Sequence, residues 1–299
     1  MTQPVEARDI LLGTTRRLAE AGIDGAALDC RLLLAAALDR DEAVLPHETL
    51  TGFDDAAAAR FAAFVERRLA GEPVSRIRGW REFWSLRLDL SEATLDPRAD
   101  SETLVVAALD EAGAARDRAL RILDLGCGTG ALVLACLSEL RAASGCGIDI
   151  DPLAVETARG NAERLGLADR ASFHQGDFAD SSAGGGGFDL VLCNPPYIPS
   201  RDIGSLAPEV ARFDPRRALD GGDDGLSCWR AVLPRIAGGL RDDGCALVEI
   251  GAGQEEDVAR LARVSGLAER RRVRDLGGIV RCLVFSHDEG HLPDERLSG

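Results

Sequence analysis

The sequence predicts an α/β protein in which a mostly parallel β-sheet carries helices on both faces and follows a small helical domain. Three observations on the 299 residues support this prediction. Residues 5–70 show only helical periodicity. From about residue 99 onward, short apolar segments alternate with helical ones, which is typical of parallel strands joined by helical crossovers. The two closing strands are joined too tightly for a crossover, so we expect the last strand to be antiparallel.

The N-terminal region is expected to form helices that pack into a small domain. Two of them are predicted over Val5–Ala21 and Ala26–Leu38. A third is predicted over residues 54–69, with Asp54 or Asp55 as its N-cap. Its large apolar residues recur along one helical face, namely Phe61, Phe64, Val65 and Leu69. This region contains no cluster of chemically reactive residues, so it is expected to serve in packing or docking.

A change of pattern after residue 72 indicates a domain boundary. The stretch "FWSLRLDL" alternates apolar and polar residues and predicts a strand or hairpin, and Pro73 and Pro97 interrupt the pattern on either side. Four parts follow: a helical bundle over 1–72, a hairpin linker over 73–98, the α/β domain over 99–287, and a polar tail over 288–299 that is expected to fray.

Within the α/β domain the elements can be placed in order. Strands are predicted at 121–125, 145–150, 171–177, 188–193 and 245–250. Helices are predicted at 131–143, near 224–240 and at 254–265, and another should begin after Asp151, which is placed to cap a helix whose first residue is Pro152. Residues 271–285 are expected to form two strands joined through Gly277 and Gly278.

Composition narrows the kind of protein. With 45% hydrophobic and 28% charged residues the chain should fold, and no run approaches the roughly 18 consecutive apolar residues of a membrane span. The first ten residues lack the features of a secretory signal, so a cytoplasmic location is expected. The eight cysteines form no C-x-x-C pair and the four histidines no ligand-like cluster, so no metal site is expected.

The net charge of −15 bears on possible partners. Every basic residue other than histidine is arginine, since the chain contains no lysine. Proteins that bind long nucleic acids without sequence preference usually carry a basic face, because phosphate contacts supply most of that affinity. The charge therefore weighs against a nucleic-acid substrate, although a local arginine patch is compatible with it.

The stretch "DLGCGTG" places Gly126, Gly128 and Gly130 where a strand turns into a helix. Glycine allows backbone to approach a ligand closely, and the helix N-terminus offers unpaired N–H groups. Together with Cys127 and Thr129, this loop predicts a cradle for a nucleotide-like cofactor, although a tight turn without a ligand has the same sequence.

Further residues on the same rim indicate an adenosine-type ligand. Asp149 ends the second strand and could hold two ribose hydroxyls. Asp177 and Phe178 follow the third strand and could hold an adenine amino group and ring face, or form a simple turn. Gly126-x-Gly128-x-x-Ala131 with a later acid also satisfies the dinucleotide fingerprint, so the loop and the acid do not choose between cofactors.

Asn194-Pro195-Pro196-Tyr197 follows the fourth strand and should face the same crevice, because ligands in open α/β sheets lie beyond the carboxyl ends of the strands. This segment suits recognition of a flat, conjugated –NH2 group. The Asn194 side-chain oxygen and the Pro195 carbonyl could each accept one hydrogen, prolines keep the loop rigid, and Tyr197 could stack on the acceptor. The alternative is a proline-rich turn that ends the strand and binds no ligand.

Together these motifs resemble the S-adenosylmethionine-dependent methyltransferases of the seven-stranded class. "NPPY" is similar to the motif of those that methylate adenine, cytosine or glutamine amides. The segments "GEPVSRIRGWREFWSLRLDLSEATLDPRADSETLV" (71–105) and "NPPYIPSRDIGSLAPEVARFDPRRALDGGDDGL" (194–226) resemble the release factor glutamine methyltransferases, the PrmC/HemK family. The resemblance covers roughly residues 5–286. Where that family usually reads Leu-Ile-Pro-Arg-Pro, this chain has Asp96 and Ala99.

The resemblance implies an enzyme that methylates the side-chain nitrogen of the glutamine in the Gly-Gly-Gln motif of peptide chain release factors, leaving S-adenosylhomocysteine. It implies that Gly126–Gly130 hold the methionine part of the cofactor, Asp149 the ribose and Phe178 the adenine. Asn194, Pro195, Pro196 and Tyr197 would bind the glutamine, with Asn194 next to the cofactor, and the helical domain would dock the release factor. The alternatives are glutamine methylation of a large-subunit ribosomal protein and N6-methylation of adenine in nucleic acid.

Overall fold

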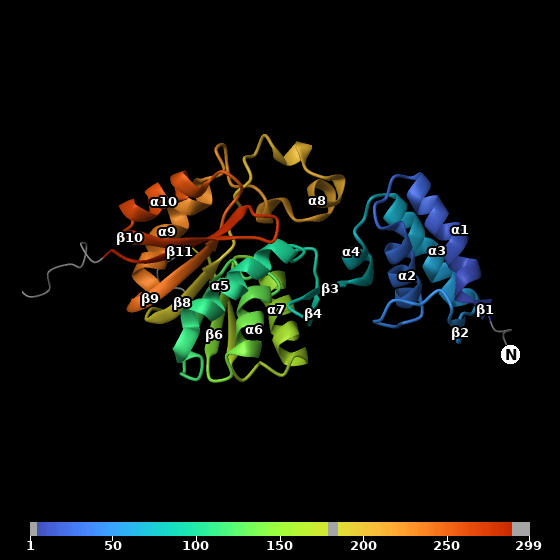
Figure 1. Cartoon of the computed structure of the whole chain (residues 1–299), viewed down its shortest axis with the longest axis horizontal. Coiled ribbons are helices and arrows are strands. Elements are labelled where there is room, and N and C mark those ends of the chain that lie inside the picture. The colour runs from blue at the N-terminus through green and yellow to red at the C-terminus, as the bar shows by residue number, and fades with distance from the viewer. Residues whose placement is uncertain (1–4, 179–184, 289–299) are drawn as a thin grey trace, which may run out of the picture. The chain divides into compact units, whose positions relative to one another are not determined.

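The computed structural model describes residues 5–178 and 185–288 (Figure 1). It forms two compact units. Unit 1 comprises Met1–Trp80 with Ala207–Phe213, and unit 2 comprises Arg81–Leu206 with Asp214–Gly299. The chain passes from unit 1 to unit 2 inside the segment predicted as a linker. Residues 289–299 of the predicted polar tail lie outside the described residues. No helix of the described ranges is long and apolar enough to cross a membrane.

Unit 1 is helical, as predicted. Its helices are α1 (Ala7–Glu20), α2 (Ala26–Ala37), α3 (Asp55–Leu69) and the short α4 (Val74–Arg78). Asp54 is the N-cap of α3, and its carboxylate accepts from the backbone N–H of Ala57 at 2.8 Å. The apolar stripe of α3 packs into the core of the unit.

The predicted start of the first helix is wrong by two residues. Val5 and Glu6 form strand β1, which pairs antiparallel with β2 (Thr49–Leu50). The Thr49 hydroxyl donates to the Glu6 carboxylate at 2.8 Å, and the N–H of Ala7 donates to the Glu48 carbonyl at 3.0 Å. The pairing partner lies more than forty residues away in the chain, so helical periodicity could not reveal it.

A distant piece of chain completes unit 1. Helix α8 (Pro208–Phe213) is attached through Arg68, whose buried guanidinium pairs with Asp29 at 2.7 Å and with Glu209 at 2.6 Å. Arg212 also donates to the Ala70 carbonyl at 3.1 Å. A buried arginine needs such partners, because an unpaired buried charge is costly. Part of the segment after Asn-Pro-Pro-Tyr therefore belongs to the helical unit.

The alternating stretch folds as the predicted hairpin, with strands β3 (Trp80–Phe83) and β4 (Leu86–Asp89). Its two turn residues, Trp84 and Ser85, have φ of 52° and 57°. Such a two-residue turn fits the right-handed twist of a hairpin. The N–H of Trp84 donates to the Glu102 carboxylate at 2.9 Å, which ties the turn to the following helix.

Unit 2 contains a seven-stranded sheet with the order β10-β11-β9-β8-β5-β6-β7. The strands are β5 (Arg121–Leu125), β6 (Ser144–Asp149), β7 (Ala171–Gln175), β8 (Phe188–Cys193), β9 (Leu240–Glu249), β10 (Leu267–Arg274) and β11 (Val280–His287). Neighbours from β7 to β9 are parallel, whereas β11 is antiparallel to both β9 and β10. The predicted sheet and its antiparallel last strand are confirmed.

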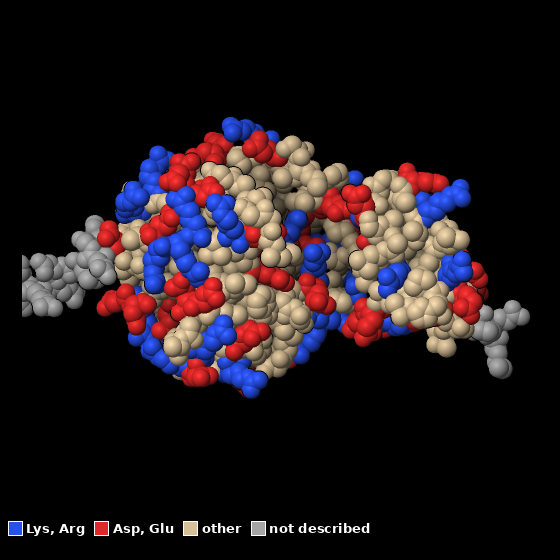
Figure 2. Space-filling view, viewed as in Figure 1, with Lys and Arg blue, Asp and Glu red and all other residues tan. Residues whose placement is uncertain are grey.

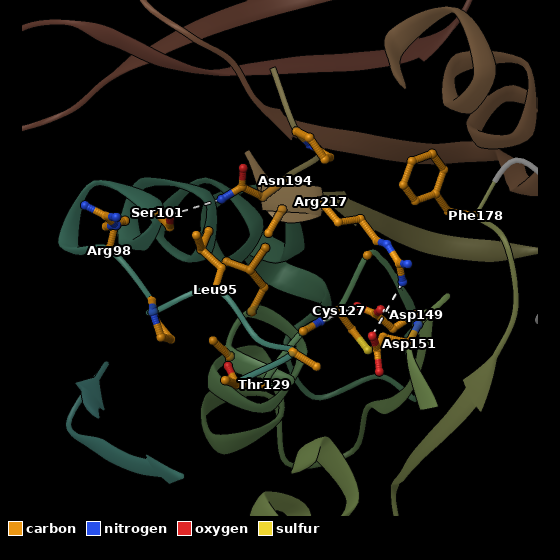
Figure 3. A pocket seen from close by; sticks show the side chains of 18 of the residues that line it. Leu95, Arg98, Ser101, Cys127, Thr129, Asp149, Asp151, Phe178, Asn194 and Arg217 are labelled. Atoms are coloured by element: carbon orange, nitrogen blue, oxygen red, sulfur yellow. Dashed lines mark hydrogen bonds and ion pairs between the residues drawn. The ribbon is translucent and has the colours of Figure 1, made fainter. Parts of the chain in front are cut away.

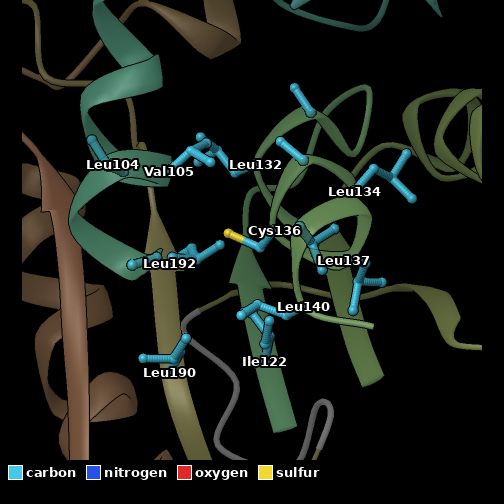
Figure 4. Close-up of a cluster of buried hydrophobic side chains, with 14 of the residues drawn as sticks. Leu104, Val105, Ile122, Leu132, Leu134, Cys136, Leu137, Leu140, Leu190 and Leu192 are labelled. Atoms are coloured by element: carbon cyan, nitrogen blue, oxygen red, sulfur yellow. The ribbon is translucent and has the colours of Figure 1, made fainter. Parts of the chain in front are cut away.

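Helices cover both faces of this sheet (Figure 1). Helices α5 (Glu102–Ala112), α6 (Ala131–Glu139) and α7 (Pro152–Arg164) share one buried cluster, shown in part in Figure 4, and α9 (Ser227–Gly239) and α10 (Glu255–Val264) share the other. Asp151 caps α7 as predicted, accepting from the N–H of Leu153 at 3.0 Å.

Helix α6 ends four residues earlier than predicted. Leu140 leaves the helical conformation and is fully buried. The guanidinium of Arg170 donates to the carbonyls of Leu137 and Ala143, both at 2.8 Å, and to that of Leu140 at 3.1 Å. Because the last carbonyls of a helix lack intrahelical partners, this arginine supplies the donors that end α6.

Strand β6 lies close to the glycine loop and to α6 because β6 has glycine at two positions. A Cβ at Gly145 would lie 2.4 Å from Val133 of α6. A Cβ at Gly147 would lie 2.5 Å from the Phe173 ring and 2.9 Å from the Cys127 sulfur. Distances below about 3 Å leave no room for a side chain, so both glycines allow β6 to approach the loop and helix that follow β5.

Asp124 joins β5 to α6 beneath the glycine loop. It is 1% exposed, and one carboxylate oxygen accepts from the N–H of Val133 at 3.3 Å. The other oxygen has no hydrogen-bond partner among the described residues. Burial raises the pKa of Asp124 from 3.8 to about 7, because a charged carboxylate is poorly solvated there.

We expect Asp124→Asn to remove a pH-dependent loss of stability. Between pH 4 and 7 the folded protein keeps the proton on Asp124 that the unfolded chain releases, so the stability of the wild type falls relative to the variant as pH rises. The gap should approach about 4 kcal/mol at most above pH 7. Urea unfolding of both proteins from pH 4 to 8, with the exposed Asp223→Asn as a charge control, measures it. A gap that does not change with pH contradicts this assignment.

Candidate active site

A pocket opens in unit 2 where β5, β6 and β8 end (Figure 3). This is the edge at which open α/β sheets bind ligands. Eight residues that the sequence predicts for the site line it: Gly126, Cys127, Gly128, Thr129, Asp149, Phe178, Asn194 and Pro196. The glycine loop and the Asn-Pro-Pro-Tyr segment therefore face one cavity, although some 70 residues separate them in the chain.

Four predicted residues do not line this pocket. Gly130 is the N-cap of α6 with φ of 79°, where a Cβ would lie 3.0 Å from Leu134. Pro195 is buried and Asp177 is exposed at the surface. Tyr197 turns away, and its hydroxyl donates to the Glu249 carboxylate at 3.1 Å. The stacking role of Tyr197 and the adenine contact of Asp177 remain predictions.

The glycine loop is held in place by the neighbouring strand. The N–H groups of Gly126 and Cys127 both donate to the Ile148 carbonyl of β6, at 2.9 and 3.0 Å. Gly126 and Gly128 have φ of 74° and 53°, in the left-handed region that favours glycine. The loop thus presents its backbone to the pocket in one fixed conformation.

Asp149 lies at the end of β6 with both carboxylate oxygens engaged. One accepts from the N–H of Gly128 at 2.9 Å and the other from the N–H of Asp151 at 3.0 Å. Burial raises the pKa of Asp149, and these two hydrogen bonds oppose that shift. A carboxylate has about four acceptor sites, so this fixed group can still accept from two vicinal hydroxyls.

The segment that follows Asn-Pro-Pro-Tyr reaches the rim of the same pocket. Arg217 comes from the short 3-10 helix Arg216–Ala218 and lies 3.5 Å from the Asp151 carboxylate (Figure 3). Across the pocket, Leu95 and Pro97 provide apolar wall. The sequence indicates these segments through their resemblance, but it does not single out Leu95, Pro97 or Arg217, because leucine, proline and arginine are common in every kind of segment.

Asp96, where the chain departs from the family pattern, is buried and lies in a charged environment. Its carboxylate is 3.7 Å from the Arg81 guanidinium, and its N–H donates to the Asp214 carboxylate at 3.3 Å. Arg98 pairs with the same Asp214 at 2.6 Å. These contacts keep Leu95 and Pro97 of this segment against the pocket.

Asn194 follows β8 directly and is half-buried. Its side-chain nitrogen donates to the Ser101 hydroxyl oxygen at 3.3 Å (Figure 3). The loop beyond it is anchored, because the Gln254 amide donates to the Tyr197 carbonyl at 3.0 Å. Neither Ser101 nor Gln254 was identified from the sequence, since polar residues of these types carry no distinctive pattern.

The residues fit an adenosine-type cofactor. Backbone from a glycine loop forms one wall, the Asp149 carboxylate offers acceptors, and Phe178 offers an aromatic face. For a metal ion the described ranges contain no cluster of three or more histidine, cysteine, aspartate or glutamate side chains. The eight cysteines, all within those ranges, are free thiols.

Arginines on the surface of unit 2 are largely matched by carboxylates. Arg270 and Arg271 both pair with Glu111, at 3.1 and 2.9 Å, and Arg272 pairs with Glu256 and Glu269, both at 2.7 Å. On the face shown in Figure 2 the two signs of charge are interspersed. Such pairing leaves less positive potential for a phosphate backbone.

Comparisons with known proteins agree with this arrangement. Residues 9–79 match the PrmC N-terminal domain family, and residues 116–217 match a methyltransferase domain family. The chain is 45% identical over 271 residues to the release factor glutamine methyltransferase of Bradyrhizobium diazoefficiens, covering 89% of this chain and 90% of that protein. It is 46% identical over 280 residues to that of Rhodospirillum rubrum, covering 90% and 81%.

A solved structure with the same fold is the catalytic domain of hMettl16 in complex with the MAT2A 3'UTR hairpin 6. The match has a TM-score of 0.55 and 15% identity, and covers 84% of this chain and 89% of that chain. At this identity the likeness concerns the fold alone.

We expect Asp149→Ala to weaken binding of the predicted cofactor. The variant loses the acceptors for two hydroxyl groups, and hydrogen bonds to a charged group contribute roughly 1.5–3 kcal/mol, so affinity should fall about 10- to 100-fold. Calorimetric titration with S-adenosylhomocysteine measures this, and Asp169→Ala, an exposed aspartate before β7, is the control. Unchanged affinity in a folded Asp149→Ala protein rules out the role of this carboxylate.

Proposed function

The chain belongs to the release factor glutamine methyltransferase family, and from this premise we propose that it transfers a methyl group from S-adenosylmethionine to the side-chain amide nitrogen of the glutamine in the Gly-Gly-Gln motif of peptide chain release factors. The observation that carries the proposal is the position of Asn194. It lines the same pocket as the glycine loop and Asp149, so an amide bound by Asn194 would lie beside the cofactor.

The side-chain nitrogen of the substrate glutamine is a poor nucleophile because its lone pair is delocalised into the carbonyl. In our proposal the Asn194 side-chain oxygen and the Pro195 carbonyl each accept one hydrogen of the glutamine –NH2 group. Both acceptors stabilise the positive charge that grows on nitrogen during transfer. Proline at Pro195 and Pro196 fixes φ and removes backbone donors, so these oxygens do not need to reorganise.

When bound, S-adenosylmethionine would supply an electrophilic methyl carbon to the glutamine nitrogen and would leave as the neutral thioether S-adenosylhomocysteine. Asn194 and Pro195 orient the nitrogen for this step, and the proton that it loses passes to water. Positioning of reacting groups can lower a barrier by about 7–11 kcal/mol, so no strong base is required.

The cofactor is assigned to the wall opposite Asn194 in the same proposal. Gly126–Gly130 would hold its methionine part through backbone groups, Asp149 would accept from the ribose hydroxyls, and Phe178 would contact the adenine. The fixed loop conformation and the engaged Asp149 carboxylate support these roles, because neither needs to rearrange on binding.

We further propose that unit 1 docks the release factor. Its core is complete in itself, and the family match over residues 9–79 covers nearly all of its helices. Helix α8, which pairs with Arg68, places part of the segment following Asn-Pro-Pro-Tyr in the unit assigned to docking.

One assay separates this function from its alternatives. The purified protein is incubated with radiolabelled S-adenosylmethionine and, in parallel, with a release factor, large-subunit ribosomal proteins and DNA. We expect label in the release factor, on the glutamine of Gly-Gly-Gln by mass spectrometry. Label only in a ribosomal protein or in DNA would reject the proposed substrate.

We expect Asn194→Ala to abolish transfer while cofactor binding is largely kept. Loss of one preorganised group that stabilises transition-state charge costs about 10²–10³-fold in rate. Single-turnover transfer to a release factor measures the loss, and titration with S-adenosylhomocysteine measures binding in the same preparation. Equal activity of variant and wild type would remove Asn194 from the mechanism.

A further inference from the structure

We propose that Glu249 and Ser101 are positioning residues that determine which end of the Asn194 amide faces the substrate. The inference rests on the proposed function, because it concerns the group that would bind the glutamine. Three side chains follow one another from β9 through the segment before α5 to the end of β8. We call these three residues the amide relay: Glu249, Ser101 and Asn194.

Strand register brings the ends of the relay together. Strands β8 and β9 are parallel, and Cys193 pairs with Val248. Asn194, the first residue after β8, and Glu249, the last residue of β9, therefore lie at the same level on neighbouring strands. Ser101 ends the 3-10 helix Ala99–Ser101 and approaches both of them.

One contact and one unpaired oxygen place the three side chains in order. The Asn194 side-chain nitrogen donates to the Ser101 oxygen at 3.3 Å. Burial raises the pKa of Glu249, and the nearby Ser101 hydroxyl opposes that shift. Glu249 is 2% exposed, and its Oε2 is buried without a hydrogen-bond partner in the described ranges. That oxygen needs a donor, and the hydroxyl hydrogen of Ser101 can supply it.

The direction of these hydrogen bonds follows from chemistry. An ionised carboxylate can only accept, so the Ser101 hydroxyl must donate to it. The serine oxygen then accepts, and the side-chain group of Asn194 that can donate is –NH2. The two ends of an asparagine amide have nearly the same shape, so only their partners decide the orientation. The relay thereby leaves the Asn194 oxygen to accept from the glutamine –NH2 group.

Two further groups favour the ionised, accepting form of Glu249 and so oppose the rise in its pKa on burial. The Tyr197 hydroxyl donates to its Oε1 at 3.1 Å. The positive charge of Arg281 acts on the same carboxylate, and this guanidinium is itself held by Asp100 at 3.2 Å and Asp275 at 3.0 Å. This explains why Tyr197 of the Asn-Pro-Pro-Tyr segment points away from the pocket: it supports the carboxylate behind Asn194.

The decisive variant is Glu249→Gln. Glutamine has the same shape but can donate, so it lets the Ser101 hydroxyl turn and donate to the Asn194 oxygen. The Asn194 –NH2 would then face the glutamine –NH2, where two donors cannot bond. We expect kcat to fall about 10- to 100-fold, the range typical for residues that orient a site group, with affinity for S-adenosylhomocysteine within about twofold of wild type.

The orientation can be observed without any assay of activity. The chain has only two asparagines, Asn161 and Asn194, so selective ¹⁵N-asparagine labelling gives two side-chain –NH2 signals, which Asn194→Ala assigns. Asn161 is an internal reference, because its –NH2 donates to the carbonyls of Asp89 and Thr129. In wild type the Asn194 –NH2 should show a proton contact to Ser101. In Glu249→Gln that contact should be lost while the Asn161 signals stay in place.

Two further variants separate orientation from general damage. Ser101→Ala should lose activity and the contact, whereas Ser101→Thr keeps the hydroxyl and should restore transfer to within a few fold of wild type. Glu111→Gln removes a partly buried carboxylate of α5 that pairs with Arg270 and Arg271, and is the matched control for stability and rate.

An unchanged Asn194 contact in Glu249→Gln, or an unchanged kcat, would overturn the relay. Failure of the wild type to methylate any release factor, together with the expected change in the Asn194 signals, would instead overturn the proposed substrate and leave the relay standing.

Discussion

The site depends on the parallel pairing of β8 with β9. Because Cys193 and Val248 are in register, Asn194 and Glu249 emerge side by side at the carboxyl edge of the sheet. In the proposed amide relay, the buried Glu249 carboxylate accepts from the Ser101 hydroxyl, and the serine oxygen accepts from the Asn194 amide. The side chain proposed to bind the substrate would thus be oriented by groups within the protein rather than by contacts with the substrate.

A second set of contacts prepares the cofactor side in the same way. The carbonyl of Ile148 holds the start of the glycine loop, Asp149 holds its middle, and glycine at Gly147 gives the loop the room it needs. Asp124, buried below, links the strand before the loop to the helix after it at a cost in stability that depends on its proton. Both walls of the pocket are therefore built from groups whose polar atoms are committed to neighbouring strands.

Much of this could be predicted from the sequence, because the informative patterns are local. Strand β5, the Asp151 cap and the turn at Gly277–Gly278 each follow from a few adjacent residues. The glycine loop and Asn194 can be placed at one edge because each follows the carboxyl end of a predicted strand. The β1–β2 pairing, the attachment of α8 to Arg68 and the early end of α6 could not, since each depends on a partner far away in the chain. The sequence also does not indicate Ser101, Arg217 or Glu249. Their residue types are common, and only the fold shows what these side chains contact.

In the proposed mechanism a rigid pair of oxygens receives the glutamine nitrogen next to the cofactor. The most direct measurement is a crystal structure of the protein with S-adenosylhomocysteine and a Gly-Gly-Gln peptide. We expect the glutamine nitrogen at about 2.7–3.2 Å from both the Asn194 side-chain oxygen and the Pro195 carbonyl, on the side that faces the sulfur. A complex in which Asn194 presents its –NH2 to the peptide, or in which the glutamine lies away from the sulfur, would contradict it.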